Sequence, residues 1–182
     1  MTTVIFDGKH LASDSQRTRT VGNVPVSKFY KGAKYKKLKT GRYAGKYVAK
    51  AGREEVTAAM IRALEDNVHL YEVQISRDPL EHGSLMLVDM RTSEVLVIDS
   101  DDMNIREMRV PAAIGSGADL ALGASLAGKS AVEAIKIAAT RDDGTGGKVY
   151  ALSRRAVLRH RKGGISTKQI RSSKGRRRNR KG

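Results

Sequence analysis

The chain opens with MTTVIFDGKHLASDS, residues 1–15, in which two short apolar runs flank Asp7-Gly8. An Asp-Gly pair between runs of strand-forming residues is a strong local signal for a tight β-hairpin. We therefore predict strands over residues 3–6 and 10–13 that pair with each other. This hairpin would place the beginning of the chain inside the core of the protein.

The remaining elements follow from the spacing of apolar residues and from turn and capping signals. They group into two sets of strands with helices outside them, a pattern typical of a layered α+β domain. We predict strands over 24–30 and 43–49, a helix over 54–66, a hairpin of 84–90 and 94–99 around Arg91-Thr92-Ser93, a strand end near 112–114, a small-residue helix closed by Gly128, a helix opened by the capping box Ser130–Glu133, and a last strand near Tyr150.

Length and composition limit the number of domains and the class of protein. The 182 residues, 40% of them hydrophobic, suit one domain with a core of its own. We expect this domain over residues 1–150 and a basic, flexible tail over 151–182. No apolar run approaches the roughly 20 residues of a membrane span, and no signal peptide precedes the first strand, so we expect a soluble cytoplasmic protein without a membrane partner. With no cysteine and four scattered histidines, the chain is expected to hold no disulfide, metal or cofactor.

The formal net charge of +16 is unevenly distributed along the chain. Residues 15–53 contain twelve Lys or Arg and residues 144–182 contain fourteen, and neither block contains an acidic residue. The segment between them, 54–143, has eight basic residues and seventeen acidic ones. An acidic body between two basic blocks is typical of a protein that binds a polyanion.

The two basic blocks therefore predict binding to DNA or RNA through phosphate contacts. Tyrosines interleave with the lysines of the first block and are candidates for stacking on unpaired bases. No helix-turn-helix or RNA-binding signature is present, so we expect low sequence specificity. A solubilising tail or lysines guarding a sheet edge is the alternative interpretation. The candidate contacts are Lys34, Lys36, Lys37, Lys39, Arg42, Arg154, Arg155, Arg159, Arg161, Lys162, Arg176, Arg177, Arg178 and Arg180.

Four segments, in order, resemble one family: TTV…ASDS at the start, KYVAKAG before a helix, AAIGSGADLALGA, and RDDGTGG. The resemblance is to the N-terminal nucleophile hydrolases of the proteasome β-subunit and HslV type, above all to compact proteasome-like proteins of phage genomes. It covers roughly residues 2–150. It implies a four-layer αββα sandwich, reduced here because residues 67–82 are too short for the usual helix pair. It also implies a homo-oligomer, a peptide substrate and, for a phage protein, a location in the bacterial host cytoplasm.

The resemblance also implies which residues form the active site. Thr2 would be the nucleophile once Met1 is removed, and Asp14 the acid behind it. The nearby ammonium would be Lys28, with Lys31 as a competing match in this lysine-rich segment. The remaining members would be Gly52, whose backbone amide would receive the oxyanion, and Ser116, Asp142 and Thr145, which would complete the polar network.

This set of residues is chemically coherent. A threonine hydroxyl is a poor nucleophile, but an α-amino group on the same residue, with an ordinary pKa of about 7.7 to 8.0, can act as its base. A lysine ammonium nearby would keep that amine neutral, and Asp14 would keep the lysine charged. Lys50 departs from the family pattern, because it stands where a small or apolar residue usually lies beside the substrate pocket.

Three functions remain open at this point. The first is a threonine peptidase with added nucleic-acid binding. The second is a protein that keeps the fold without the activity and binds DNA or RNA. The third is a structural unit of a ring-shaped assembly.

Overall fold

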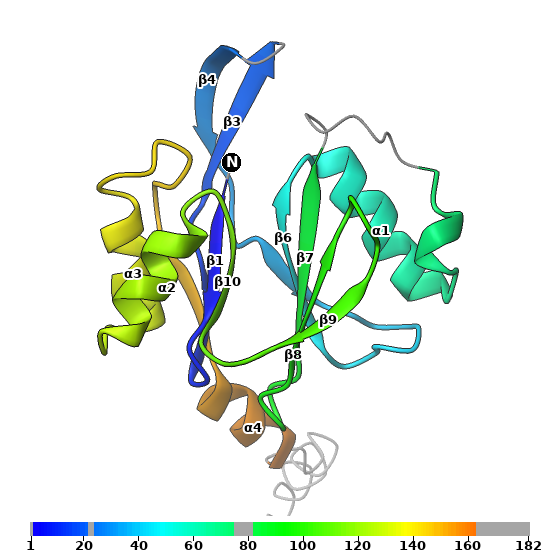
Figure 1. Ribbon diagram of the computed structural model, residues 1–182. Helices are drawn as coiled ribbons and strands as arrows, with labels where there is room; N and C mark the ends of the chain where they lie inside the picture. The colour runs from blue at the N-terminus through cyan, green and yellow to red at the C-terminus, as the bar shows by residue number, and fades with distance from the viewer. Residues whose placement is uncertain (1, 22–23, 75–81, 163–182) are drawn as a thin grey trace, which may run out of the picture.

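Two antiparallel sheets face each other across the centre of the protein, and helices cover the outer side of each (Figure 1). The computed structural model describes residues 2–21, 24–74 and 82–162. The layers run helix, sheet, sheet, helix, which is the layered sandwich expected from the order of the elements. None of the helices in these ranges is long and apolar enough to cross a membrane.

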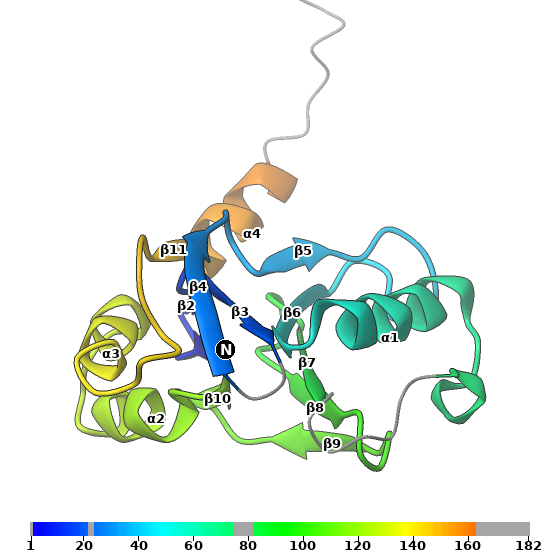
Figure 2. The same cartoon turned by 90° about the horizontal axis from the view of Figure 1, so that it is seen from above.

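The first sheet contains the opening hairpin at its centre, in the strand order β10-β1-β2-β11. Helices α2 and α3 lie side by side on its outer face (Figures 1 and 2). The bounds are β1 Thr3–Phe6, β2 His10–Ser13, β10 Ala112–Gly115, β11 Tyr150–Ser153, α2 Ala118–Leu126 and α3 Ala131–Ala138.

The second sheet has the order β5-β6-β7-β8-β9, and helix α1 packs on its outer face against β6 and β7. A short 3-10 turn, η1, follows α1. The bounds are β5 Tyr35–Lys37, β6 Tyr47–Gly52, β7 Gly83–Val88, β8 Val95–Asp99, β9 Ile105–Met108, α1 Glu54–Asp66 and η1 Leu70–Glu72.

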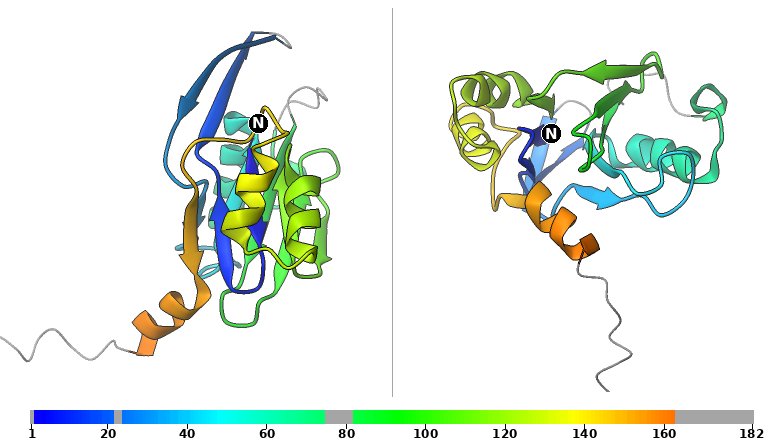
Figure 3. Two further views of the ribbon diagram at one scale, coloured as in Figure 1. Left: turned by 90° about the vertical axis from the view of Figure 1, so that its left-hand side faces the viewer. Right: turned by 90° about the horizontal axis from the view of Figure 1, so that it is seen from below.

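Two elements project from opposite ends of the sandwich (Figure 3). A separate hairpin, β3 Gln16–Val21 and β4 Val24–Tyr30, extends from the end at which the chain begins. Helix α4, Arg154–Lys162, extends from the other end. Its first residue anchors it, because the Arg154 guanidinium donates to the carbonyl oxygens of Met90 and Arg91 at 2.8 and 2.6 Å.

The apolar runs of the sequence are strands that are buried on both faces. In β1, Val4 and Phe6 point into the core between the sheets, while Ile5 points the other way, toward the core under α2 and α3. Strand β7 repeats this pattern, with Met86 facing the other sheet and Leu85 facing α1. Successive side chains of a strand point to opposite faces, so a strand between two layers must be apolar throughout.

Several predicted elements are confirmed. The opening hairpin pairs in the register Val4 with Ser13 and Phe6 with Leu11. Helix α1 covers the predicted range, and the 83–99 hairpin is present. The Ser130–Glu133 capping box forms in both directions at the start of α3.

Other elements were missed or misplaced. Strands β3, β5 and β9 are short or polar and were not predicted. The strand predicted over 43–49 begins only at Tyr47, because Gly41 and Gly45 adopt left-handed conformations in the preceding turns. Strand β11 crosses the expected boundary at residue 150 and α4 continues from it, so the sandwich includes the start of the expected tail. Residues 163–182 of that tail lie outside the described ranges.

The two isoleucines of α3 test the layer arrangement. Ile135 is fully buried against the first sheet, whereas Ile137 is 40% exposed on the same helix. We expect Ile135→Ala to lower the free energy of unfolding by about 2 to 5 kcal/mol, because it leaves a cavity in the core. Ile137→Ala is the matched control and should cost about 1 kcal/mol or less. Urea unfolding of both variants measures this, and equal losses would contradict the packing of α3.

Candidate active site

The backbone of Thr2 is held at the start of β1, an inner strand of the first sheet. Thr2 is 5% exposed, and its carbonyl oxygen accepts a hydrogen bond from the Ser116 amide at 2.9 Å. Gly115 makes this approach possible. It has a φ of +103°, and a Cβ at this position would lie 1.9 Å from the Thr2 carbonyl oxygen. Any side chain at position 115 would therefore collide with the backbone of Thr2.

Asp14 lies directly behind Thr2 and is fully buried. Its Oδ1 accepts from the Thr3 amide at 3.1 Å and from the Lys34 ammonium at 3.1 Å. Its Oδ2 accepts from the amides of Gln16 at 3.2 Å and Gly146 at 3.0 Å. These four hydrogen bonds replace those with water that the Asp14 carboxylate loses on burial.

The lysine beside Thr2 is Lys34, in the turn before β5. Its side chain is 3% exposed, and its Nζ donates to Thr2 Oγ1, to Asp14 Oδ1 and to the carbonyl oxygen of Gln16. Three acceptors match the three N–H bonds of an ammonium group. Burial lowers the pKa of Lys34 below its ordinary value, although the Asp14 charge and hydrogen bond act in the opposite direction.

This placement corrects two predictions. Lys28 is exposed on β4, where its ladder partner is Thr18, and is not the lysine beside Thr2. The competing match, Lys31, is also exposed. Lys34 was predicted to contact phosphate but is buried in the site. The sequence offered no signal for choosing among these lysines, because the choice depends on how far the β3–β4 hairpin displaces the chain.

Ser116, Asp142 and Thr145 lie together in a second polar network. Asp142 accepts from Ser116 Oγ at 2.8 Å, from the Gly144 amide at 3.1 Å and from Thr145 Oγ1. Thr145 also shares a hydrogen bond with Thr3 Oγ1. Burial raises the pKa of Asp142, but these hydrogen bonds outweigh it and hold the pKa below the ordinary value. Asp142 is therefore ionised at neutral pH.

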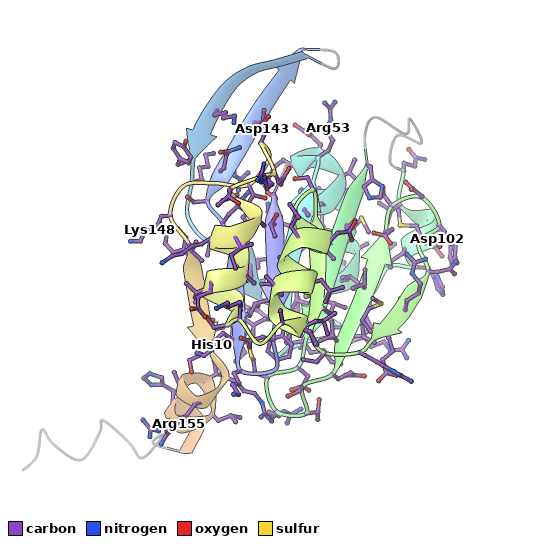
Figure 4. The ribbon with its side chains drawn as sticks, turned by 60° about the vertical axis from the view of Figure 1, so that its left-hand side comes forward. His10, Arg53, Asp102, Asp143, Lys148 and Arg155 are labelled. Carbon is purple, nitrogen blue, oxygen red and sulfur yellow. The ribbon has the colours of Figure 1, made fainter. Side chains whose placement is uncertain are left out.

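A cavity of about 1010 Å³ opens beside Thr2, and Gly52 and Lys34 line it together with Thr2. Gly52 has a φ of +93°, and a Cβ there would lie 2.3 Å from the His82 carbonyl oxygen. The position therefore admits only glycine. The cavity lies at the end of the sandwich where the chain begins, and the labelled Arg53 and Asp143 mark this end (Figure 4). Within the described ranges, no three His, Cys, Asp or Glu residues are placed to hold a metal ion.

The predicted phosphate-contacting residues fall in separate places. Lys36 and Lys37 lie on β5, an edge strand, and Lys36 pairs with Glu65 at 3.0 Å. Lys39 and Arg42 are exposed on the following turns. Arg154 anchors α4, as described above. Arg155 and Arg159 are exposed, and Arg161 and Lys162 end the helix. Arg176, Arg177, Arg178 and Arg180 lie outside the described residues.

Arg155 and Arg159 line a second cavity, of about 800 Å³, together with Lys9, His10 and Arg154. None of the residues that line it is acidic. The labelled His10 and Arg155 mark this part of the molecule, away from Arg53 and Asp143 (Figure 4). Lys9 lies in the turn of the opening hairpin and His10 is the first residue of β2, so neither was recognisable as part of a basic block.

Comparison with known proteins shows similarity at the level of the fold. No protein-family model matches the chain, and no curated protein sequence matches it. Among solved structures, the chain is similar to BPH of Thiobacillus denitrificans, a bacterial proteasome homologue, with 18% identity, a TM-score of 0.54, and coverage of 83% of this chain and 95% of that one. A structure of the same protein in complex with epoxomicin gives 17% identity, a TM-score of 0.54, and coverage of 83% and 96%.

This likeness supports the proteasome-like fold that the resemblance implied. At such low identity it concerns the fold alone. The narrower resemblance to phage proteins stays an expectation.

The buried pair of Lys34 and Asp14 makes a prediction about stability. Lys34→Met would leave the Asp14 carboxylate buried without its cation, so we expect a loss of about 3 to 5 kcal/mol in the free energy of unfolding. Lys28→Met, the matched control at an exposed position of β4, should change it by about 0.5 kcal/mol or less. Chemical denaturation of the two variants measures the difference.

A double variant sharpens this test. Adding Asp14→Leu to Lys34→Met removes the uncompensated carboxylate and should regain part of the lost stability. If Lys28→Met proved as damaging as Lys34→Met, the assignment of the buried lysine would be wrong.

Proposed function

We propose that the protein is a threonine peptidase that becomes active when Met1 is removed. The observation that supports this most directly is the contact of the Lys34 ammonium with Thr2 Oγ1, with Asp14 buried behind both. An ammonium against a hydroxyl stabilises the negative charge that develops on its oxygen during attack. The cavity beside Thr2 offers room for a peptide.

The chemistry would proceed in two steps. In the first, the Thr2 α-amine accepts the proton of the Thr2 hydroxyl, and Oγ1 bonds to the carbonyl carbon of the substrate amide. The oxyanion formed is stabilised by the Gly52 amide, and the proton passes to the leaving amine as the C–N bond breaks. In the second, water attacks the ester on Thr2 and the α-amine takes a proton from it. The amine returns this proton to Oγ1 as the ester C–O bond breaks and the acid product leaves. The Lys34 ammonium, paired with Asp14, stays beside Oγ1 in both steps.

Processing and the nucleophile can be tested together. We expect intact-mass measurement of the active protein to show the loss of one methionine residue. Thr2→Ala should reduce peptide hydrolysis by about a thousandfold or more, because the hydroxyl forms the covalent intermediate. Thr2→Ser, which retains both hydroxyl and amine, should keep a measurable part of the rate. Hydrolysis by a form that retains Met1, or by Thr2→Ala at the original rate, would refute the mechanism.

A binding measurement gives independent support. One fold neighbour was solved in complex with epoxomicin, and we propose that the processed form of this protein binds it as well. A rise in melting temperature on adding epoxomicin is expected for the processed wild type and not for Thr2→Ala. An equal rise in both would place the compound away from Thr2.

Nucleic-acid binding is a second candidate function, favoured by the cavity beside α4. Its lining includes Lys9, Arg154, Arg155 and Arg159 and no acidic residue, and it lies away from the Thr2 cavity. The lysines of β5 are weaker candidates, because edge strands are commonly guarded by lysine and Lys36 already has a carboxylate partner. A phosphate backbone at the α4 end would leave the Thr2 cavity open.

The salt dependence of binding tests this second function. Replacing Lys9, Arg155 and Arg159 together with alanine should weaken binding to duplex DNA. The slope of log affinity against log salt should fall by about 0.9 for each phosphate that the protein no longer neutralises. Fluorescence anisotropy over a salt series measures both quantities.

A control with the same charge change separates local binding from the effect of net charge. Arg62, Lys136 and Arg141 are exposed on the acidic middle segment of the chain, and none of them lines the cavity beside α4. Their combined replacement with alanine should leave most of the affinity in place. An equal reduction of affinity in both triple variants would mean that binding reflects total charge alone.

Self-association, expected from the resemblance, stays a prediction. The outer surface of α2 and α3 exposes Leu120, Leu126 and Ile137, with 41%, 70% and 40% of each residue exposed. Exposed apolar side chains grouped on one face are typical of contact surfaces between proteins.

A further inference from the structure

The cavity beside α4 is formed by two segments whose backbones are joined. On one side lie Gly8 and Lys9, in the turn of the opening hairpin, and His10, the first residue of β2. On the other side lie Ser153, the last residue of β11, and helix α4, which follows it directly. The Arg154 amide donates to the Lys9 carbonyl oxygen at 2.8 Å. This hydrogen bond holds the start of α4 against the hairpin turn.

Helix α4 turns one face toward this cavity. Arg155, Leu158 and Arg159 line it, and their i, i+3, i+4 spacing places them on the same side of the helix. Val157 packs instead against the core between the two sheets. The helix therefore presents one leucine and two arginines to the cavity.

Three cations around the cavity have no carboxylate partner. Lys9, Arg155 and Arg159 line it and form no ion pair with the residues that the structure describes. The segment after α4 can supply no carboxylate side chain, because the chain has no acidic residue beyond Asp143. The three side chains are therefore available to an anion that enters the cavity.

Asp7, in the same hairpin turn, cancels only part of this positive charge. Its carboxylate accepts from the amides of Lys9, His10 and Ala131 at 2.7, 2.6 and 2.8 Å, and it does not line the cavity. Burial raises the pKa of Asp7, but these hydrogen bonds outweigh it and hold the pKa below the ordinary value. Asp7 is therefore ionised, and one carboxylate offsets at most one of the three cations.

The cavity also offers surfaces for a flat, weakly polar group. The His10 side chain is 39% exposed, and it lies opposite Ser153 in the β2–β11 ladder. Figure 4 shows His10 and Arg155 at the same end of the molecule. An imidazole ring can stack on a nucleobase, and Leu158 adds an apolar contact. The volume of about 800 Å³ is within the range of about 300 to 1000 Å³ that is typical of small-ligand sites.

We propose that this cavity holds one unstacked nucleotide of a single strand of DNA or RNA. The base packs against His10 and Leu158, and the phosphates on either side of it bind the three free cations. This inference rests on the proposed nucleic-acid binding and names the form of nucleic acid that enters the site. In a duplex, each base is paired and stacked between its neighbours, so no base can reach the side chains of the cavity. A duplex therefore contacts only the cations, whereas a single strand also fills the cavity.

The test compares probes that have the same phosphates and differ in their bases. A labelled strand of twenty thymidines and a strand of equal length with abasic sites throughout are titrated with the full chain at one pH and one salt concentration. Fluorescence anisotropy measures the affinities. The thymidine strand should bind about tenfold more tightly than the abasic strand, because the stacking of one base accounts for a factor of this size.

Variants assign this difference to the cavity. His10→Ala should bring the affinity for the thymidine strand down toward that for the abasic strand. His10→Phe retains a ring that can stack and should keep the difference, which separates the ring from any charge on the imidazole. His160→Ala is the matched control, because His160 is exposed on α4 and does not line the cavity. It should keep the full difference between the two strands.

Competitors test the class of ligand. Unlabelled thymidine strand should displace the labelled one far more effectively than polyglutamate with the same number of charges, or than free thymidine monophosphate. Equal displacement by polyglutamate would assign the cavity to an acidic peptide, and equal displacement by the monophosphate would assign it to a free nucleotide. Either result would overturn the proposal.

A duplex of the same length separates this inference from nucleic-acid binding itself. Equal affinities for the thymidine strand and the abasic strand, together with salt-dependent binding of the duplex, would refute the inference and leave nucleic-acid binding in place. A difference between the strands that survives His10→Ala would place the base outside the cavity. Failure of all three probes to bind would refute the nucleic-acid function.

Discussion

The carboxylate of Asp14 is the constraint on which the site depends. It is fully buried and receives hydrogen bonds from the backbone of Thr3 and Gln16, from the loop at Gly146, and from the Lys34 side chain. These groups come from four segments of the chain that are distant in sequence or separated by a turn. A buried charge is tolerated only when it is fully hydrogen-bonded and paired. The need to satisfy one carboxylate therefore brings the start of the chain and the lysine together.

The same charges connect the reacting atoms to the cavity wall. Burial is the main reason that the pKa of Lys34 is low, Asp14 opposes it, and Arg17 and Glu54 act on it with opposite signs. Arg17 and Glu54 also line the Thr2 cavity, where they pair with each other. The pKa of Lys34 therefore depends on the cavity wall as well as on Asp14.

The elements that could be predicted are those specified by local signals. Asp7-Gly8 set the opening hairpin, and the spacing from Val56 to Leu64 set α1. The Ser130–Glu133 capping box set the start of α3. The elements that were missed have weak local signals. Strand β3 alternates Arg and Thr, β9 is exposed throughout, and α4 is a highly basic helix whose first residue is anchored by carbonyl groups more than 60 positions earlier in the chain. Long-range contacts stabilise them, and such contacts cannot be read from local pattern.

By itself the sequence determined two sets of strands with helices outside them, the opening hairpin, and the glycine turn that contains Gly115, because turn chemistry and apolar periodicity act over a few residues. Its resemblance to the proteasome-like family also pointed to five active-site candidates, which are Thr2, Asp14, Ser116, Asp142 and Thr145. Only the tertiary structure decided that Lys34 rather than Lys28 lies against Thr2, and that Arg17 and Lys50 share Glu54. The physical reason is that lysines along an extended, lysine-rich segment are locally equivalent. Which one is buried is decided by the strands and the carboxylate that surround it after folding.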